Sequence, residues 1–540
     1  MSTRKLVANF LSLLLGVVVS QCLPGFDALA QHHALIVGVG QYSSASGATP
    51  LQGVPKDLDV ARRMAIALGI PADRIIELRD SNATKVNIVA ALEGIRQKIM
   101  VGEHVFIYFS GHGTSYTTSA GCEQAVVPYT PGRHTVDDVI TEAELATYTS
   151  RISEKADKAI VLIDACFSGG MGAAGTRSVA RAFGARPKFI SRSDDQCSVA
   201  VNQTSATRGF IPVIQRFGIP EENFVQISAA RHNEVSWDTE QYGGLATYSL
   251  GQCLLGDAQD LNRSGAITLD EVRLCAQTKL DALMAPHRSE GMLPSTILMR
   301  GARNLVVVTD APIKPPFAGG AAEPPAAISA APYSVPPDQS AKVDIPITTA
   351  PVPIPFDGHI PGALAETSRE LPAEQLAASS ATLADIFAQR NGRLRLEVVA
   401  PKRLIIGRDV FNFSVTSSMD GYLYAVMLGS DGKSFYLLYP NKLDRDNRIK
   451  ANLRYTFPKA GWSISAAGPA GTNQVLFVVA PSPVNKQLFS AVDNSAGGPF
   501  SFSVADLTAR KRLVDFFVGS GRQGHDRRIA AAMVRVDEVP

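Results

Sequence analysis

Continuous apolar runs of strand length alternate with helix-like segments in the first half of this chain. The apolar runs cover residues 34–40, 74–78, 104–113, 158–169 and 223–230. Between them, residues 57–69 and 84–99 carry apolar side chains at helical spacing. Strands that are apolar throughout are buried on both faces, which favours a mostly parallel sheet covered by helices on both sides. We therefore expect an α/β domain over residues 31–308, with its ligand beyond the carboxyl ends of the strands.

Two of these runs end in chemically reactive residues. Successive side chains of a strand alternate in direction, so Ser110 and His112 share one direction, as do Asp164 and Cys166. A thiolate is a nucleophile, and a neighbouring imidazole can favour it and later protonate a leaving amine. Each residue also has an ordinary alternative, because a cysteine at a strand end is usually a small buried hydrophobe and Asp164 could cap a helix. Together the four side chains predict a Cys–His site.

The segments YFSGHG (108–113) and DACFSGG (164–170) resemble the histidine and cysteine motifs of caspase-like peptidases, in particular the metacaspase and bacterial orthocaspase branch. In caspases the histidine lies roughly 50 residues before the cysteine, and the two motifs here fit that spacing. The resemblance covers residue 33 to about residue 308 and includes residues 51–64 and 225–254. It implies a caspase-like sheet and an endopeptidase that acts on protein or peptide substrates.

The resemblance also assigns roles to particular residues. His112 would be the general acid and base, and Cys166 the nucleophile. The main-chain N–H groups of Gly113 and Cys166 would form the oxyanion hole. In this branch the residues that correspond to Asp57, Ser110 and Asp164 line the S1 pocket. A pair of carboxylates matches an ammonium or guanidinium group, so cleavage after Lys or Arg is expected.

The chain departs from the caspase pattern in ways that bear on specificity. No arginine follows the first strand, where VGVGQYSS (37–44) stands, so a cationic pocket for aspartate is not expected. Phe167 replaces the histidine that is common after the metacaspase cysteine. Asp57 has an alternative role, because it could serve as the N-cap of its own helix.

Residues 176–189, TRSVARAFGARPKF, follow the cysteine and are rich in arginine and small residues. The corresponding loop of the family is sometimes cleaved during activation, which makes Arg177, Arg181 and Arg186 candidate self-processing sites. The alternative is a solvated basic loop.

The segment DLNRSGAITLDE (260–271) fits the twelve-residue loop of calcium-binding helix–loop–helix motifs. Gly265 stands at the sharp turn, and few of the ligand positions carry charge, so a weak affinity of about 10⁻⁴–10⁻³ M is expected. The alternative is a loop that folds without metal. No cofactor is otherwise required. The candidate ligands are Asp260, Asn262, Ser264, Ala266, Thr268 and Glu271.

The first 30 residues have the features of a signal peptide: a basic start, an apolar run and small residues before Ala30. The run is shorter than the roughly 18–20 residues that span a bilayer. We expect export to the periplasm or the extracellular space, with no membrane span in the mature chain. Five cysteines then remain, which allows up to two disulfides and one free thiol, for which Cys166 is the candidate. They are Cys122, Cys166, Cys197, Cys253 and Cys275.

The second half of the chain has a different pattern. Residues 312–361 hold 13 of the 33 prolines, mixed with alanine, so residues 309–378 are predicted to be a linker. Short alternating or aromatic strands follow a helix-like piece at 379–390, and Asp431–Gly432 marks a hairpin. We expect a β-sandwich-like domain over residues 379–540. Residues 417–441 resemble a β-rich accessory domain of unknown function found in exported bacterial proteins.

The net charge of +2 gives no indication of a nucleic-acid partner. The sequence therefore predicts an exported cysteine endopeptidase with an accessory domain. One alternative is a catalytically silent relative that binds other proteins through the same fold. A zinc site is disfavoured because no further ligands cluster near the cysteine and histidine.

Overall fold

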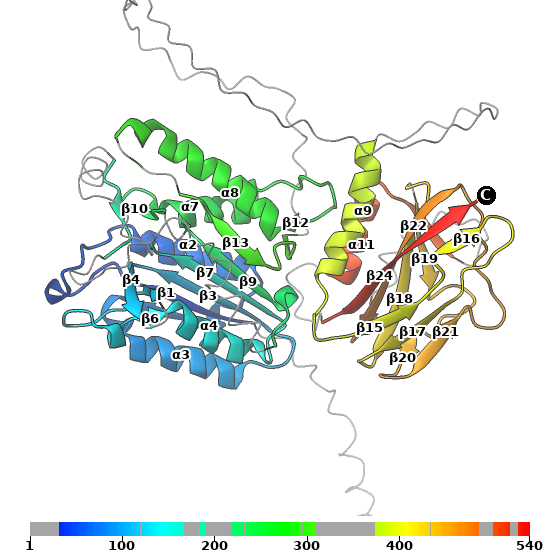
Figure 1. Ribbon diagram of the computed structural model, residues 1–540, viewed down its shortest axis with the longest axis horizontal. Coiled ribbons are helices and arrows are strands. Elements are labelled where there is room, and N and C mark those ends of the chain that lie inside the picture. The colour runs from blue at the N-terminus through cyan, green and yellow to red at the C-terminus, as the bar shows by residue number, and fades with distance from the viewer. Residues whose placement is uncertain are drawn as a thin grey trace, which may run out of the picture. The chain divides into compact units, whose positions relative to one another are not determined.

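The computed structural model describes residues 32–118, 121–166, 183–190, 218–231, 234–290, 292, 295–308, 373–432, 434–484, 500–518 and 528–540. The first half of the chain forms the predicted α/β domain around a six-stranded sheet (Figure 1). Five strands are parallel, and only the short edge strand β13 is antiparallel. In spatial order the strands are β13 (Leu298–Gly301), β9 (Phe224–Ser228), β7 (Lys158–Asp164), β3 (His104–Ser110), β1 (His33–Gly38) and β2 (Ile75–Arg79).

Helices cover both faces of this sheet, as the apolar strands require (Figure 1). One face carries α3 (Lys85–Lys98) and α4 (Glu142–Ser153). The other carries α2 (Val54–Ala67), α7 (Leu245–Gln252) and α8 (Leu269–Met284). Local sequence sets the helix starts, since the Thr84 hydroxyl accepts a hydrogen bond from the Asn87 amide at the start of α3. The mostly parallel α/β fold predicted from the sequence is confirmed.

Three small sheets accompany the main sheet, and the first two lie at its carboxyl end, around the candidate site. Directly after β3, β4 (Gly113–Thr118) pairs with β5 (Gly121–Val126), which pairs with β6 (Ile140–Thr141). A second small sheet joins β8 (Arg186–Pro187), β10 (Trp237–Thr239) and β11 (Gly243–Gly244). A third pairs β12 (Ile267–Thr268) with β14 (Val306–Val308).

The C-terminal region is rich in strands, as expected, and its described residues also form two helices. The predicted helix-like piece at 379–390 overlaps α9 (Ala373–Ala388), which begins within the predicted linker, whereas α11 (Leu507–Phe517) was not predicted. Asp431–Gly432 lies in the turn between β18 and β19, where the hairpin was expected. The strands are β15 (Leu396–Val399), β16 (Arg403–Ile405), β17 (Phe413–Ser417), β18 (Gly421–Leu428), β19 (Ser434–Tyr439), β20 (Arg448–Ile449), β21 (Arg454–Phe457), β22 (Gly471–Ala480), β23 (Ser501–Val504) and β24 (Ala530–Val539).

The central strands of this region are buried on both faces. In β18, Tyr424 and Val426 share a hydrophobic core with residues of α9 and α11. Their neighbours Leu423 and Ala425 point to the opposite face and share a core with β17 and β21. One large sheet is therefore covered by two helices on one side and by a three-stranded sheet on the other.

Among the described residues, no helix combines the length and the apolar character needed to cross a bilayer. The predicted signal peptide and nearly all of the predicted linker lie outside the described residues.

Candidate active site

The ends of β3 and β7 bring the predicted polar residues together. Ser110 is the register partner of Asp164, because the two parallel strands run side by side to their last residues. Both side chains are fully buried. His112 follows one strand by two residues and Cys166 follows the other by two, so all four residues lie at the carboxyl edge that the sequence indicated.

The His112 ring is held in one orientation and one tautomer. Its Nε2 atom lies 2.7 Å from the carbonyl oxygen of Thr49. A carbonyl oxygen can only accept, so Nε2 carries the proton and Nδ1 of the neutral ring has a free lone pair. Nδ1 is buried and has no hydrogen-bond partner among the described residues. Burial lowers the pKa of His112 to about 4, which keeps the ring neutral and Nδ1 able to accept a proton.

Cys166 is a free, buried thiol that contacts the main chain of Ser236. Its Sγ atom accepts a hydrogen bond from the Ser236 amide at 2.7 Å and donates to the Ser236 carbonyl oxygen at 3.1 Å. Burial raises the pKa of the thiol to about 12. In this arrangement the sulfur is protonated and turned toward Ser236.

Asp57, Ser110 and Asp164 form a closed acidic pocket, although Asp57 comes from helix α2 on a different part of the chain. The Ser110 hydroxyl donates to Asp57 Oδ2 at 2.7 Å. The main-chain N–H of Gly244 donates to Asp57 Oδ1 at 2.7 Å. Burial raises the pKa of the Asp57 carboxyl to about 6, although Lys188 acts in the opposite direction. The alternative role of Asp57 as a helix cap is wrong, because the N-cap residue of α2 is Gly53 and no side chain caps this helix.

The side chain of Lys188 fills this pocket, and it is completely buried. Its Nζ atom lies 2.8 Å from Asp57 Oδ2, 2.9 Å from Asp164 Oδ2 and 2.9 Å from Ser110 Oγ. Burial by itself would lower the pKa of the ammonium group, but the two carboxylates raise it above its ordinary value. The pocket therefore binds one ammonium group with two negative charges and one hydroxyl.

The main chain of Lys188 is also hydrogen-bonded to the residues of the candidate site. Its carbonyl oxygen accepts a hydrogen bond from the Gly113 amide at 2.9 Å and from the Cys166 amide at 3.0 Å. These are the two N–H groups expected to form an oxyanion hole. The Lys188 amide donates to the Ser236 carbonyl oxygen at 3.0 Å. The Lys188 carbonyl oxygen is thus hydrogen-bonded to the main-chain N–H of Cys166, the candidate nucleophile. Both residues are also hydrogen-bonded to the main chain of Ser236.

The segment on either side of Lys188 is extended and bound at both ends. Before Lys188, β8 pairs antiparallel with β10. After it, the Ile190 amide donates to the Gly113 carbonyl oxygen at 3.0 Å, and the Thr114 hydroxyl donates to the Ile190 carbonyl oxygen at 3.1 Å. Residues 186–190 therefore cross the site as an extended segment that is hydrogen-bonded on both sides of Lys188.

Sequence reasoning missed several residues that shape the pocket. The Thr247 hydroxyl donates to Asp164 Oδ2 at 2.6 Å, and the Ser236 hydroxyl also donates to Asp164. Gly244 leaves the space for the ammonium group, because a Cβ atom there would lie 2.1 Å from Asp164 Oδ2 and 2.5 Å from Lys188 Nζ. All three lie far along the chain from β7, so no local pattern connects them with Asp164.

The candidate self-processing arginines are placed differently from Lys188. Arg186 does not enter the acidic pocket; one of its guanidinium nitrogens donates to the Pro50 carbonyl oxygen at 2.7 Å. Arg177, Arg181 and Phe167 lie outside the described residues. Lys188 stood in the same stretch, but sequence reasoning considered only the arginines. Nothing in the local pattern separates this lysine from its basic neighbours.

The predicted calcium loop is closed by hydrogen bonds to its own chain. Glu271 Oε1 accepts from the Leu261 amide at 2.8 Å, and Oε2 accepts from the Thr268 amide at 2.8 Å, as part of the capping box that starts α8. Asp260 accepts from the amides of Ser264 and Gly265 at 2.9 and 2.8 Å. Across the part of the chain that is described, no group of three or more His, Cys, Asp and Glu side chains is placed to hold a metal ion. The oxygen-rich loop has the right donor type for calcium, but its acids are already engaged, so the fit is poor.

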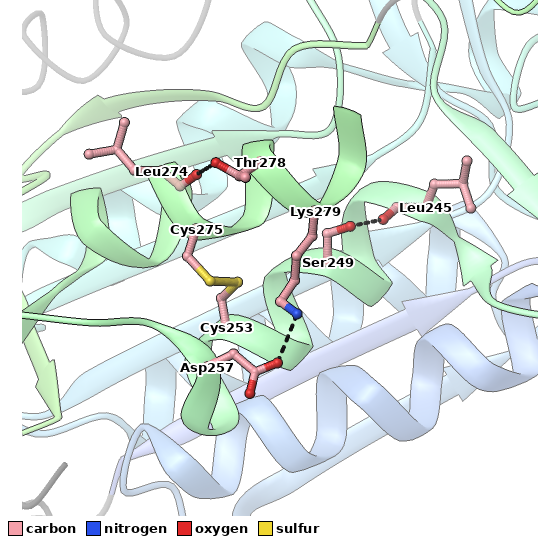
Figure 2. The surroundings of a disulfide bond; sticks show 8 residues. All are labelled: Leu245, Ser249, Cys253, Asp257, Leu274, Cys275, Thr278 and Lys279. Carbon is pink, nitrogen blue, oxygen red and sulfur yellow. Dashed lines mark hydrogen bonds and ion pairs between the residues drawn. A yellow bond between two sulfur atoms is a disulfide. The ribbon is translucent and has the colours of Figure 1, made fainter. Parts of the chain in front are cut away.

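A disulfide between Cys253 and Cys275 connects α7 and α8 (Figure 2). It joins the residue directly after α7 to the middle of α8. An ion pair of 2.9 Å between Lys279 and Asp257 links α8 to the same turn. Helix α7 carries Thr247 and begins next to Gly244, both of which line the acidic pocket. The disulfide therefore restrains a helix that contributes to this pocket. Cys197 and the side chain of Cys122 lie outside the described residues.

Comparison with known proteins agrees with the fold. Residues 31–277 match the family model of the caspase domain, and residues 405–483 match a domain of unknown function (DUF4384). No curated protein matches the chain. One similar solved structure is the crystal structure of protein GSU0716 from Geobacter sulfurreducens, which is 14% identical, with a TM-score of 0.34, over 50% of this chain and 92% of that one. The chain therefore contains a caspase domain over residues 31–277 and a domain of unknown function over residues 405–483.

Proposed function

We propose that the chain is an exported cysteine endopeptidase that uses Cys166 and His112 and cleaves after Lys or Arg. The observation that supports the proposal is the binding of Lys188. Its carbonyl oxygen accepts hydrogen bonds from the N–H groups of Gly113 and Cys166, while its ammonium group lies between Asp57 and Asp164. A peptide bound in this way presents a carbonyl carbon next to the cysteine and a basic side chain to the acidic pocket.

The chemistry follows from the positions of the donors and acceptors. Sγ of Cys166 would turn away from Ser236 and attack the carbonyl carbon, and Nδ1 of His112 would take the thiol proton. The N–H groups of Gly113 and Cys166 would stabilise the oxyanion, which is the largest single contribution in many acyl-transfer enzymes. His112 would pass its proton to the leaving amine, and water would then hydrolyse the thioester and restore the thiol.

Specificity is attributed to the buried carboxylates. Asp57 and Asp164 place two negative charges around one site of ammonium size, which favours Lys and is also compatible with the guanidinium of Arg. An aspartate side chain would bring a third negative charge into a buried site, which is strongly unfavourable. The pocket therefore selects against acidic residues as well as for basic ones.

Fluorogenic peptides that end in Lys, Arg or Asp test this proposal on residues 31–540. Hydrolysis is expected after Lys and Arg and not after Asp. The Cys166→Ala variant should have no activity, and His112→Ala should lower kcat by about 10²–10⁴-fold. Thermal unfolding of each variant controls for loss of the fold. Cleavage after Asp would contradict the assigned pocket but not the nucleophile. Absence of all cysteine-dependent hydrolysis would favour the silent protein-binding alternative.

Export and calcium binding are two further proposals, and they rest on sequence patterns rather than on the binding of Lys188. Export rests on the predicted signal peptide, and N-terminal sequencing of the expressed full chain should find a mature start at Gln31. Calcium rests on the loop pattern alone, and no catalytic step depends on it. Adding calcium or a chelator to the peptide assay tests whether the loop matters for activity.

A further inference from the structure

We propose that the loop at residues 260–266 is a docking site for the C-terminal domain of the same chain. Through this site and a second set of contacts, the C-terminal domain (residues 373–540) stays bound to the α/β domain (residues 32–308) without help from the chain that connects them. The described residues of both domains belong to one compact unit. The inference gives a role to the calcium-like loop, which the proposed function leaves unexplained, and it does not require peptidase activity.

Helix α9 of the C-terminal domain contacts the loop by a hydrogen bond and by apolar packing. The Thr382 hydroxyl donates to the Ser264 carbonyl oxygen at 2.8 Å. Ala266 is 2% exposed and belongs to the same hydrophobic core as Leu383 and Ile386 of α9. The loop therefore completes the core of the C-terminal domain, and separation of the two domains would expose apolar side chains of both.

Helix α11 brings a positive charge to the acidic loop. Arg510 is 5% exposed, and its Nε atom donates to the Arg263 carbonyl oxygen at 2.7 Å. Burial lowers the pKa of Arg510, and the charge of Asp260 acts in the opposite direction. A guanidinium group is always charged and donates hydrogen bonds from a rigid plane. Arg510 thus supplies to this loop the positive charge that a calcium ion supplies to loops of the same pattern.

Two glycines, one in each domain, lie where the domains touch. A Cβ atom at Gly265 would lie 2.6 Å from the main-chain nitrogen of Lys511 in α11. A Cβ atom at Gly392 would lie 2.4 Å from Pro220 Cβ and 2.8 Å from Glu222 Oε2 in the α/β domain. Each domain therefore approaches a position of the other that has no room for a side chain, and the two surfaces are matched in shape.

The second set of contacts involves the starts of β7 and β9 and the residues that follow α9. Lys158 Nζ donates to the Arg390 carbonyl oxygen at 3.0 Å, and the Asn391 side-chain amide donates to Asp157 Oδ1 at 2.6 Å. Asp157 and Lys158 are 3% and 2% exposed. Burying a charged group is costly unless its hydrogen bonds are made, and here the C-terminal domain completes them.

This second set of contacts lies at the opposite end of the main sheet from the candidate active site. Lys158 is the first residue of β7, whereas Asp164 is its last. A substrate can therefore reach Cys166 without opening these contacts. Satisfied buried charges, a shared apolar core and close main-chain approach are features of a permanent interface rather than a transient one.

The test is to insert a recognition sequence for a site-specific protease into residues 313–371 and to cut the chain there completely. Residues 31–540 with Cys166→Ala are used, so that the chain's own cysteine cannot cut it. Sedimentation and size-exclusion chromatography should show the two pieces bound to each other, with a Kd below about 1 µM. Separation of the pieces at concentrations tenfold above that value, whether they are folded or unfolded, would overturn the inference.

Gly392→Val tests whether the contacts described here hold the pieces together. The added side chain would meet Pro220 and Glu222, so the Kd of the cut protein should rise by about 100-fold or more. Gly94→Val in α3 is the matched control, because no atom of the described residues lies within 4 Å of a Cβ atom built there, and its Kd should not change. Neither glycine has a positive φ, so backbone strain does not enter. Equal Kd values for Gly392→Val and its control would overturn the inference.

Arg510→Met tests the loop itself, because it removes the guanidinium group and keeps an apolar side chain. The Kd should rise by about tenfold or more. Arg454→Met, at an exposed position of β21, is the control and should bind as before. Circular dichroism of the uncut chains controls for folding, and Gly392→Val remains the deciding variant if Arg510→Met does not fold. An unchanged Kd in a folded Arg510→Met protein would overturn the docking role of the loop.

These measurements are independent of the proposed function. All of them use the Cys166→Ala chain, so an inactive wild-type protein would contradict the proposed peptidase and leave the docking site standing. Pieces that separate although the wild-type chain hydrolyses Lys peptides would overturn the docking site and leave the peptidase standing.

Discussion

The pocket around Lys188 and the loop at residues 260–271 both gather acidic side chains, but they satisfy them in opposite ways. In the loop, Asp260 and Glu271 accept hydrogen bonds from main-chain amides that are only 3 to 10 residues away in the sequence. In the pocket, Asp57 and Asp164 share an ammonium group that comes from a segment far along the chain. Main-chain donors belong to the loop itself, whereas the proposed function requires Lys188 to give way to the basic side chain of a substrate. The difference separates an acidic cluster that stabilises a turn from one that is proposed to recognise a ligand.

The largest expected effect is that of neutralising a pocket acid. Asp164→Asn keeps the shape of the side chain but removes one of the two charges that face Lys188 Nζ, so kcat/KM for a Lys peptide should fall by about 10³-fold. Asp260→Asn is the matched control, and its activity should stay within about twofold of the wild type. Equal losses in both variants would abolish the distinction between the two clusters.

Loss of the disulfide should affect stability rather than catalysis. Cys253 and Cys275 are 22 residues apart, and opening a loop of that size costs about 3 kcal/mol in the chain-entropy account. The double variant Cys253→Ser, Cys275→Ser should therefore unfold at lower denaturant concentration while keeping its activity under native conditions. A selective loss of activity with unchanged stability would mean that the bond positions α7 for catalysis.

Glycine substitutions contrast the two regions directly. Gly244→Ala would place a methyl group 2.1 Å from Asp164 Oδ2, so it should raise KM for Lys peptides by about tenfold or more, by shrinking the space for the ammonium group. Gly265→Ala is strained in its backbone, because φ is +98° at that position, and its Cβ atom would also lie 2.6 Å from the main-chain nitrogen of Lys511. It should lower stability by about 1–2 kcal/mol. Peptide kinetics and denaturant unfolding of both variants check the contrast, and a stability loss in Gly244→Ala without a KM change would contradict it.

The sequence predicted the parts of the site that depend on local pattern. The alternation of side chains along two parallel strands placed Ser110, His112, Asp164 and Cys166 at one edge, and the register of β3 with β7 agrees with that expectation. The role of Asp57 came only from the resemblance to a family, since its helix could have used it as a cap. Lys188 was missed because its contact with Asp57 spans 131 residues. Tertiary contacts of this kind leave no periodic trace in the chain.

Calcium should have the smallest effect, and it probes the loop most directly. Both carboxylate oxygens of Glu271 already accept main-chain hydrogen bonds, so a metal ion would have to displace donors that the fold provides. We expect calcium at millimolar concentration to change the Tm by no more than about 1 °C and to leave peptide hydrolysis unchanged. Glu271→Gln, which weakens the capping box of α8, should lower stability by about 1 kcal/mol with or without calcium. A Tm increase of several degrees that is lost in Glu271→Gln would instead show that the loop is a cation site, and the contrast with the pocket would then be one between two kinds of ligand.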